Sequence, residues 1–222
     1  MGAMDTLRLP THLLLVRHGE TTANVEGTWQ GASDSPLTER GRRQVERLAA
    51  RLAAMERPIA IVYTSPLGRA LTTAQILVAG LGNPPLVLDP GLAEFNMGEW
   101  EGLTYRQLAQ EKRLWERMAA DPHFAPPRGE SAVGFAMRLL NTFGAIRRRH
   151  PGQTVLVVSH GGALATALSL LLYGDGSRWN AFQLANGSLT ELEWIEERPR
   201  LLRLNDTGHL DGILTALRAD VA

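Results

Sequence analysis

The chain has 222 residues, 44% of them hydrophobic, and equal numbers of acidic and basic side chains, so its formal net charge is zero. This length suits one α/β domain with a full core, and the neutral balance argues against nucleic acids and membrane surfaces as partners bound by bulk charge. The absence of cysteine excludes disulfides and thiol nucleophiles, and no apolar run reaches the roughly 18–20 residues that span a bilayer.

The first half of the chain alternates strand-like and helix-like patterns. Residues 13–16 are uniformly apolar, which predicts a buried strand. Thr38 is placed to cap the next helix, in which apolar residues recur at helical spacing. Residues 59–63 predict a second buried strand, a helix follows and ends near Gly80, and residues 86–88 predict a short third strand.

The second half continues the alternation. Residues 104–120 predict one helix, which ends before a group of prolines, and residues 131–149 predict another with three arginines at its end. Residues 154–158 predict a fourth strand before an apolar helix, and residues 188–194 alternate as expected of a late strand at a sheet edge. Strands that alternate with helices indicate a layered α/β fold with a largely parallel sheet, and we expect a single domain over residues 1–222.

Residues with the chemistry of phosphoryl transfer follow these strands. His18 follows the first strand and His160 the fourth, and ligands of open α/β sheets bind at the carboxyl ends of strands. Arg17, Arg69 and Glu94 should reach the same crevice. Arginine offers forked donors to phosphate oxygens, histidine is a nucleophile near neutral pH, and a carboxylic acid can protonate a leaving alcohol.

Five sequence blocks carry these residues in a fixed order. They are Leu-Leu-Val-Arg-His-Gly-Glu-Thr at 14–21, Leu-Thr-Glu-Arg-Gly at 37–41, Ser-Pro-Leu-Gly-Arg-Ala at 65–70, Glu94 with Gly-Glu-Trp-Glu-Gly at 98–102, and Val-Ser-His-Gly-Gly at 158–162. Together they resemble the signature of the histidine phosphatase superfamily, also called the phosphoglycerate-mutase-like fold. The resemblance implies a three-layer α/β/α fold with a largely parallel central sheet and a small helical cap inserted at about residues 95–128.

The resemblance also implies the role of each residue. His18 matches the nucleophile that becomes phosphorylated, and a local backbone carbonyl orients its second ring nitrogen. Arg17, Arg69 and His160 match the residues that bind the phosphoryl oxygens. Glu94 matches the acid that protonates the departing oxygen and then activates water, so catalysis would rest on positioning within a cationic pocket.

Three further residues complete the expected substrate site. Asn24 matches a side chain that hydrogen-bonds the phosphoryl group, and Gln30 matches a polar contact of many family phosphatases. Gly161, beside His160, belongs to the same substrate site. We expect no cofactor and no metal, because the sequence contains no carboxylate–histidine cluster of the kind that binds one.

Several of these assignments have ordinary alternatives. The Ser-His-Gly-Gly segment at 159–162 also suits a tight turn between a strand and a helix. Arg69 also suits an arginine at a helix start that pairs with a carboxylate. Glu99 and Glu101 compete with Glu94 for the role of the acid.

The sequence favours a phosphatase of small-molecule phosphate monoesters over a cofactor-dependent phosphoglycerate mutase. Mutases of this family typically continue after the acid with an Arg-His-Tyr-Gly-like stretch and a longer basic insert, whereas here residues 95–102 are Phe-Asn-Met-Gly-Glu-Trp-Glu-Gly. Residues 163–168 lack the arginine that many members carry there, which puts a contact from this helix to a substrate carboxylate in doubt. A catalytically idle phospholigand-binding module is a third alternative, against which the retention of the five reactive residues argues.

The remaining expectations concern location and partners. Residues 1–4 lack the basic and apolar regions that begin a secretory signal, which predicts a cytoplasmic protein. The expected partner is a small phosphate monoester, with no nucleic acid and no membrane. The sequence leaves open the alcohol half of the substrate and the oligomeric state, a homodimer included.

Overall fold

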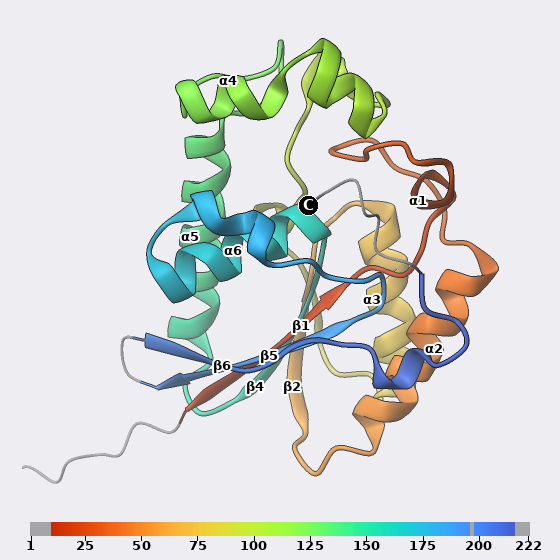
Figure 1. Ribbon diagram of the computed structural model, residues 1–222. Coiled ribbons are helices and arrows are strands. Elements are labelled where there is room, and N and C mark those ends of the chain that lie inside the picture. The colour runs from red at the N-terminus through yellow and green to blue at the C-terminus, as the bar shows by residue number, and fades with distance from the viewer. Residues whose placement is uncertain (1–9, 196–197, 216–222) are drawn as a thin grey trace, which may run out of the picture.

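The computed structural model describes residues 10–195 and 198–215, which share one six-stranded sheet (Figure 1). The strand order is β3-β2-β4-β1-β5-β6. The first four strands in this order are parallel, β5 is antiparallel to β1, and β6 is antiparallel to β5. The strands are β1 (Thr11–Arg17), β2 (Ile59–Thr64), β3 (Leu86–Leu88), β4 (Thr154–Ser159), β5 (Leu189–Ile195) and β6 (Arg198–Asp206).

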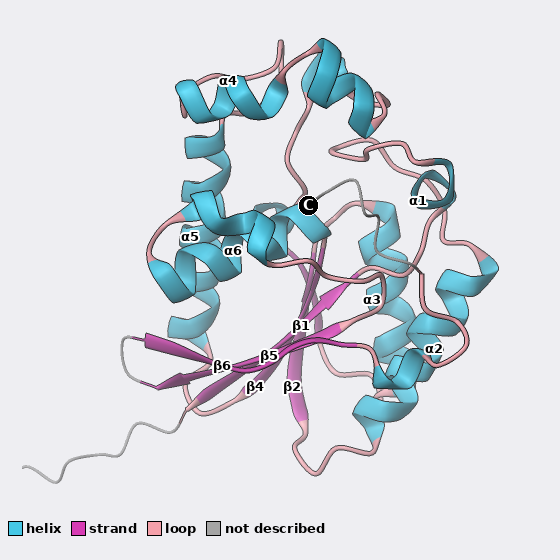
Figure 2. Ribbon diagram, viewed as in Figure 1, coloured by secondary structure: helices cyan, strands magenta, loops and turns pink. Residues whose placement is uncertain are grey.

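Helices cover both faces of the sheet (Figure 2). One face carries α2 (Glu39–Ala53) and α3 (Gly68–Gly80), and the other carries α5 (Ala132–Arg149) and α6 (Gly161–Tyr173). The shorter elements are α1 (Thr22–Glu26), α4 (Leu114–Ala120), the π-helix η3 (Gln107–Glu111), and the 3₁₀ helices η1 (Pro90–Leu92), η2 (Gly98–Trp100), η4 (Gly176–Ala181) and η5 (Gly208–Leu210). The predicted three-layer α/β/α fold with a largely parallel sheet is confirmed.

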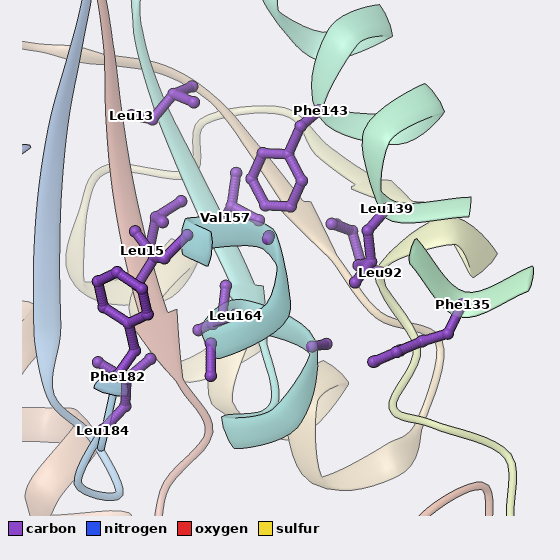
Figure 3. Close-up of a cluster of buried hydrophobic side chains, with 14 of the residues drawn as sticks. Leu13, Leu15, Leu92, Phe135, Leu139, Phe143, Val157, Leu164, Phe182 and Leu184 are labelled. Carbon is purple, nitrogen blue, oxygen red and sulfur yellow. The ribbon is translucent and has the colours of Figure 1, made fainter. Parts of the chain in front are cut away.

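The central strands contribute side chains to two separate apolar clusters, because successive side chains of a strand point to opposite faces of the sheet. Leu13 and Leu15 of β1 belong to the cluster under α5 and α6 (Figure 3), and Leu14 and Val16 belong to the cluster under α2 and α3. All four side chains are at most 2% exposed. Burial on both faces explains why this strand is an unbroken apolar run.

The long helices begin as the sequence predicts. The Thr38 hydroxyl accepts a hydrogen bond from the backbone N–H of Gly41 at the start of α2, and Ser131 does the same for Gly134 at the start of α5. These side chains satisfy N–H groups that have no partner within the first turn of a helix.

The helix predicted for residues 104–120 is wrong as a single element. The π-helix η3 ends before Arg113, whose φ of 52° is left-handed, and α4 begins directly after it. Leu108 and Leu114 are both fully buried in the core. Six residues of α-helix would place these two side chains about 120° apart around the axis, so the chain breaks between them and both face inward.

The prediction of an edge position for the late strand is also wrong. β5 lies between β1 and β6, and β6 is the edge strand. The sequence did not predict β6, because the strand has a proline near its start, Pro199, and two exposed leucines, Leu202 and Leu204. Its apolar residues therefore do not mark a buried face. Proline is tolerated there because an edge strand leaves part of its backbone unpaired.

No helix within the described residues is long and apolar enough to cross a membrane. The segment at residues 1–4, on which the expected location depends, lies outside the described residues.

Candidate active site

His18 and His160 meet at the carboxyl end of the sheet. They follow β1 and β4, which are parallel neighbours that pair Arg17 with Ser159 at their ends. The two imidazole centroids lie 5.3 Å apart, and both side chains are at most 3% exposed. The two histidines are therefore neighbours, as expected from the two strand ends.

Hydrogen bonds fix the orientation of the His18 ring. Its Nδ1 lies 2.8 Å from the carbonyl oxygen of Gly19, and since a carbonyl only accepts, Nδ1 carries the proton. The side chain of Asn186 holds the His18 carbonyl at 3.1 Å. Burial first, and then the nearby Arg69 and Arg17, keep the pKa of His18 well below its ordinary value. Nε2 of a neutral ring thus retains its lone pair.

His160 presents the opposite nitrogen. Its Nε2 lies 2.8 Å from the hydroxyl of Ser65, which accepts the backbone N–H of Leu67 and can donate its own proton to the ring. In that tautomer the ring proton is on Nδ1, which is buried and has no hydrogen-bond partner within the described residues. Burial, Arg69 and His18 lower the pKa of His160 well below its ordinary value, so the ring is neutral.

Arg69 is enclosed by the loop before α2. Its terminal nitrogens donate to the carbonyl oxygens of Ser33 at 2.6 Å and Gly31 at 2.8 Å, and it pairs with Asp34 at 3.2 Å. Arg69 therefore does pair with a carboxylate, as the alternative interpretation of this residue expected. The side chain is nevertheless 1% exposed and its Nε has no acceptor.

Arg17 completes the cationic group. One terminal nitrogen donates to the carbonyl of Leu184 at 2.6 Å, and its Nε is buried without an acceptor. Burial lowers the pKa of Arg17 to about 10, so the guanidinium is charged at neutral pH. Gly161 packs against it, since a Cβ there would lie 3.3 Å from the guanidinium carbon.

Glu94 borders the same space. Its two carboxylate oxygens accept the backbone N–H groups of Phe95 at 3.0 Å and Gly162 at 2.9 Å. Burial raises the pKa of Glu94, although these two hydrogen bonds and the neighbouring Arg69 and Arg17 act against the rise. Such a carboxyl can hold a proton closer to neutral pH than an exposed glutamate can.

The two other glutamates that competed for this role lie elsewhere. Glu99 is half exposed and pairs with Arg128 at 2.8 Å on the surface. Glu101 accepts hydrogen bonds from backbone N–H groups of Gly31, Ala32, Ser33 and Met97. These bonds and one from the Ser33 hydroxyl outweigh the effect of burial and lower the pKa of Glu101. Neither residue lines the cleft.

Asn24 and Gln30 line the cleft beside His18. Asn24 stands in α1, where its side-chain oxygen accepts from the backbone N–H of Thr21 at 3.1 Å and from Asn186 at 3.1 Å. The Gln30 amide donates to Ser35 at 2.8 Å and accepts from the Thr21 hydroxyl at 2.7 Å. Both amides are therefore fixed in place by the protein.

The cleft itself has a volume of about 200 Å³. Of the residues predicted from the sequence, Arg17, His18, Asn24, Gln30, Glu94 and Gly161 line it. Arg69 and His160 do not line it and are buried next to the residues that do. Within the described part of the chain, no group of three or more His, Cys, Asp or Glu side chains is arranged to hold a metal ion.

The sequence did not reveal the residues that support this site. Arg138 of α5 donates to the carbonyl oxygens of Gly91 at 3.0 Å, Ala93 at 2.9 Å and Glu94 at 3.3 Å, and so fixes the loop that ends at Glu94. Ser65 stands inside one of the five blocks, but Arg138 and Asn186 stand in none. Their contacts span 44 residues or more of sequence, which no local pattern shows.

Comparisons with known proteins identify the family of this chain. The sequence model of the histidine phosphatase superfamily (branch 1) matches residues 13–207. A probable phosphoglycerate mutase GpmB from Cronobacter sakazakii is 36% identical over 89% of this chain and 94% of its own length. Phosphoserine phosphatase 1 from Hydrogenobacter thermophilus is 32% identical over 89% of this chain and 93% of its own length.

A solved structure shows the same fold. The crystal structure of a phosphoserine phosphatase mutant from Entamoeba histolytica in complex with phosphoserine superposes with a TM-score of 0.80 at 30% identity, covering 90% of this chain and 99% of the other. The resemblance drawn from the five blocks is confirmed, and the chain belongs to branch 1 of the histidine phosphatase superfamily, whose members named here are phosphatases or mutases.

Proposed function

We propose that this protein is a phosphatase that hydrolyses small-molecule phosphate monoesters, without a metal, through a phosphohistidine on His18. One observation carries the proposal: Arg17, Arg69 and His160, which all lie close to His18, each have a buried side-chain nitrogen without a hydrogen-bond partner within the described residues. A buried donor without a partner costs about 1–3 kcal/mol. The oxygens of a phosphoryl group are the acceptors that would satisfy all three.

The reaction needs only groups that are present. Nε2 of His18 attacks phosphorus, the bond from phosphorus to the alcohol oxygen breaks, and protonated Glu94 gives its proton to that oxygen. The resulting Glu94 carboxylate then takes a proton from water. The water oxygen attacks phosphorus, the bond from phosphorus to nitrogen breaks, and phosphate leaves with His18 restored.

A phosphoglycerate mutase is the second candidate, because the relative from Cronobacter sakazakii carries that name. A mutase returns the phosphoryl group to a second hydroxyl and must hold a bisphosphorylated intermediate. Among the described residues Arg17 is the one arginine or lysine that lines the cleft, so a second phosphate has no cationic partner. This favours hydrolysis, as do phosphoserine phosphatases among the relatives.

The nucleophile is tested with His18→Ala. The variant should lose turnover of p-nitrophenyl phosphate by at least about 10³-fold while it keeps its circular dichroism spectrum. Rapid quench of the wild type should trap an acid-labile, base-stable phosphoenzyme that is absent from the variant, and chelators should change neither result. A burst that persists in His18→Ala would contradict the proposal.

The choice against the mutase is tested with 3-phosphoglycerate and a catalytic amount of 2,3-bisphosphoglycerate. Inorganic phosphate should appear faster than 2-phosphoglycerate. Faster formation of 2-phosphoglycerate would establish the mutase instead.

A further inference from the structure

A second cavity adjoins the reaction cleft at Glu94. Its volume is about 420 Å³, against about 200 Å³ for the cleft. Glu94, Gly162, Trp29 and Trp179 line both cavities, so the carboxyl that would protonate the leaving oxygen stands at their boundary. We call the second cavity the apolar chamber. A ligand whose phosphoryl group lies at His18 and whose ester oxygen lies at Glu94 can extend into it.

We propose that the apolar chamber binds the alcohol half of the substrate and selects phosphate monoesters of bulky, uncharged aromatic or alicyclic alcohols. The proposal rests on the proposed phosphatase function and adds its substrate class. It excludes as preferred substrates the small esters that carry a carboxylate, such as phosphoserine and the phosphoglycerates.

The walls of the chamber are mostly apolar and aromatic. Beyond the shared residues its apolar side chains include Phe95, Met97, Trp115, Met118 and Phe135. The Trp115 ring lies 5.4 Å from that of Trp29 and 5.5 Å from that of Trp179, which forms one continuous aromatic wall. Ligand sites of this size and lining bind apolar ring systems by removing their surface from water.

The charges at the chamber oppose a substrate carboxylate. Among the described lining residues the only charged side chains are two carboxylates, Glu94 and Asp175. The basic residues of the cap lie elsewhere: Lys112 and Arg117 lie 5.6 Å and 6.0 Å from the centroid of the Trp100 ring, outside the chamber lining. With Glu94 protonated, as the proposed reaction requires, a carboxylate bound here would meet the negative charge of Asp175 and no cation among the described lining residues.

Helix α6 explains why no cation reaches the chamber from that side. Gly162 and Thr166, one helical turn apart, are the residues of α6 that line the chamber. Residues 163–168 contain no arginine, the departure from the family pattern that the sequence already showed. The face of α6 that could carry a carboxylate-binding side chain carries a small hydroxyl instead.

Two donors in the wall refine the substrate class. The indole N–H groups of Trp29 and Trp115 are buried and have no acceptor within the described residues. An alcohol with an ether, carbonyl or hydroxyl oxygen near its ring would offer the acceptor that they lack.

The substrate test compares primary alkyl phosphates, which all need the same protonation of the leaving oxygen. We expect kcat/KM for 2-phenylethyl phosphate to exceed those for ethyl phosphate, phosphoserine and 3-phosphoglycerate, each by on the order of 30-fold or more. A second comparison isolates charge at nearly constant size: 2-(4-carboxyphenyl)ethyl phosphate should lose most of the advantage that 2-(4-nitrophenyl)ethyl phosphate, whose neutral nitro group has the same shape, keeps.

Variants on α5 connect this preference to the chamber. Ala136 lines the chamber, and the next residue, Met137, is 52% exposed. Ala136→Phe should fill the chamber and lower the ratio of kcat/KM for 2-phenylethyl phosphate over ethyl phosphate by at least about tenfold. Met137→Phe adds a ring on the solvent side of the same helix and should keep the wild-type ratio. Ala136→Leu is the milder version if the phenylalanine prevents folding.

The outcomes separate the two proposals. If phosphoserine or 3-phosphoglycerate is hydrolysed as well as 2-phenylethyl phosphate, or if Ala136→Phe and Ala136→Leu both keep the wild-type ratio, the chamber proposal is wrong and the phosphatase stands. If none of the esters is hydrolysed while His18→Ala and the wild type behave alike, the proposed function itself fails.

Discussion

Burial sets the protonation of three reactive side chains. It lowers the pKa of His18 and of His160 well below the ordinary value of histidine, and it raises the pKa of Glu94. Each shift favours the neutral form, because a charged group loses hydration on burial. For the proposed reaction this gives the free enzyme a nucleophile with its lone pair and an acid with its proton in the same pH range.

Glu94→Gln tests the acid. An amide cannot supply the proton, so hydrolysis of 2-phenylethyl phosphate should slow by about 10²- to 10⁴-fold, whereas p-nitrophenyl phosphate, whose leaving group needs no proton, should slow by less than about tenfold. In the wild type, kcat/KM for the alkyl ester should fall as pH rises through the raised pKa of Glu94, and this decrease should disappear in the variant. Steady-state rates between pH 4.5 and 8 measure both effects. Equal losses on the two esters would argue against Glu94 as the acid.

Among the elements, the loop at residues 31–33 connects the cap to Arg69, the arginine that we propose binds phosphate. Two of its carbonyl groups hold the guanidinium of Arg69, at 2.6 Å and 2.8 Å. Glu101 in turn accepts the three backbone N–H groups of this loop and the N–H of Met97. A carboxylate that accepts so many hydrogen bonds fixes the loop in one conformation. Glu101 is therefore a positioning residue that acts through Arg69.

We expect Glu101→Gln to weaken phosphate binding without altering the acid–base chemistry. An amide offers one acceptor oxygen where the carboxylate offers two, so the loop should loosen, with about 1–3 kcal/mol lost from the free energy of unfolding. The inhibition constant of inorganic phosphate should rise several-fold while the pH dependence of kcat stays that of the wild type. Glu99→Gln is the matched control two residues away on the surface, and it should behave as the wild type. A changed pH profile in Glu101→Gln would show that Glu101 takes part in proton transfer.

The elements that could be predicted from the sequence are those with a local signal. Uniform apolar runs indicated β1, β2 and β4, a capping threonine indicated the start of α2, and three arginines indicated the end of α5. The break at Arg113 and the edge strand β6 had none. The break exists because Leu108 and Leu114 must face the same core, a requirement that only the position of that core defines.

For the molecule as a whole, the buried histidines make stability depend on pH. Because the pKa values of His18 and His160 are lower in the folded state, only the unfolded chain takes up these protons as pH falls below about 6.5. The free energy of unfolding therefore has its full value above that pH and decreases below it. The pKa values of His12 and His209 are also lowered and act in the same direction. The raised pKa of Glu94 acts in the opposite direction, most strongly toward pH 4.5.

Urea unfolding at pH 7.0, 6.0 and 5.5 measures this dependence. Each fully buried neutral histidine should contribute up to about 1.4 kcal/mol of lost unfolding free energy per pH unit below 6.5. His18→Asn should make the slope shallower by about one such contribution. His123→Asn, at an exposed position of the cap, is the control and should keep the wild-type slope. A slope in His18→Asn equal to that of the wild type would mean that His18 is protonated in the folded state.

The sequence by itself determined the layered fold and the family, because burial on both faces leaves unbroken apolar runs and the five blocks stand next to the strand ends. It could not determine which nitrogen of His160 faces Ser65 or which of three glutamates borders the cleft. Those depend on contacts across long separations, such as Ser65 with His160 and Gly162 with Glu94. The apolar chamber depends most on such long-range packing, since its lining comes from the cap, α5, α6 and η4 together. Its shape and charge exist only after these segments pack, so the tertiary structure alone could suggest the substrate class.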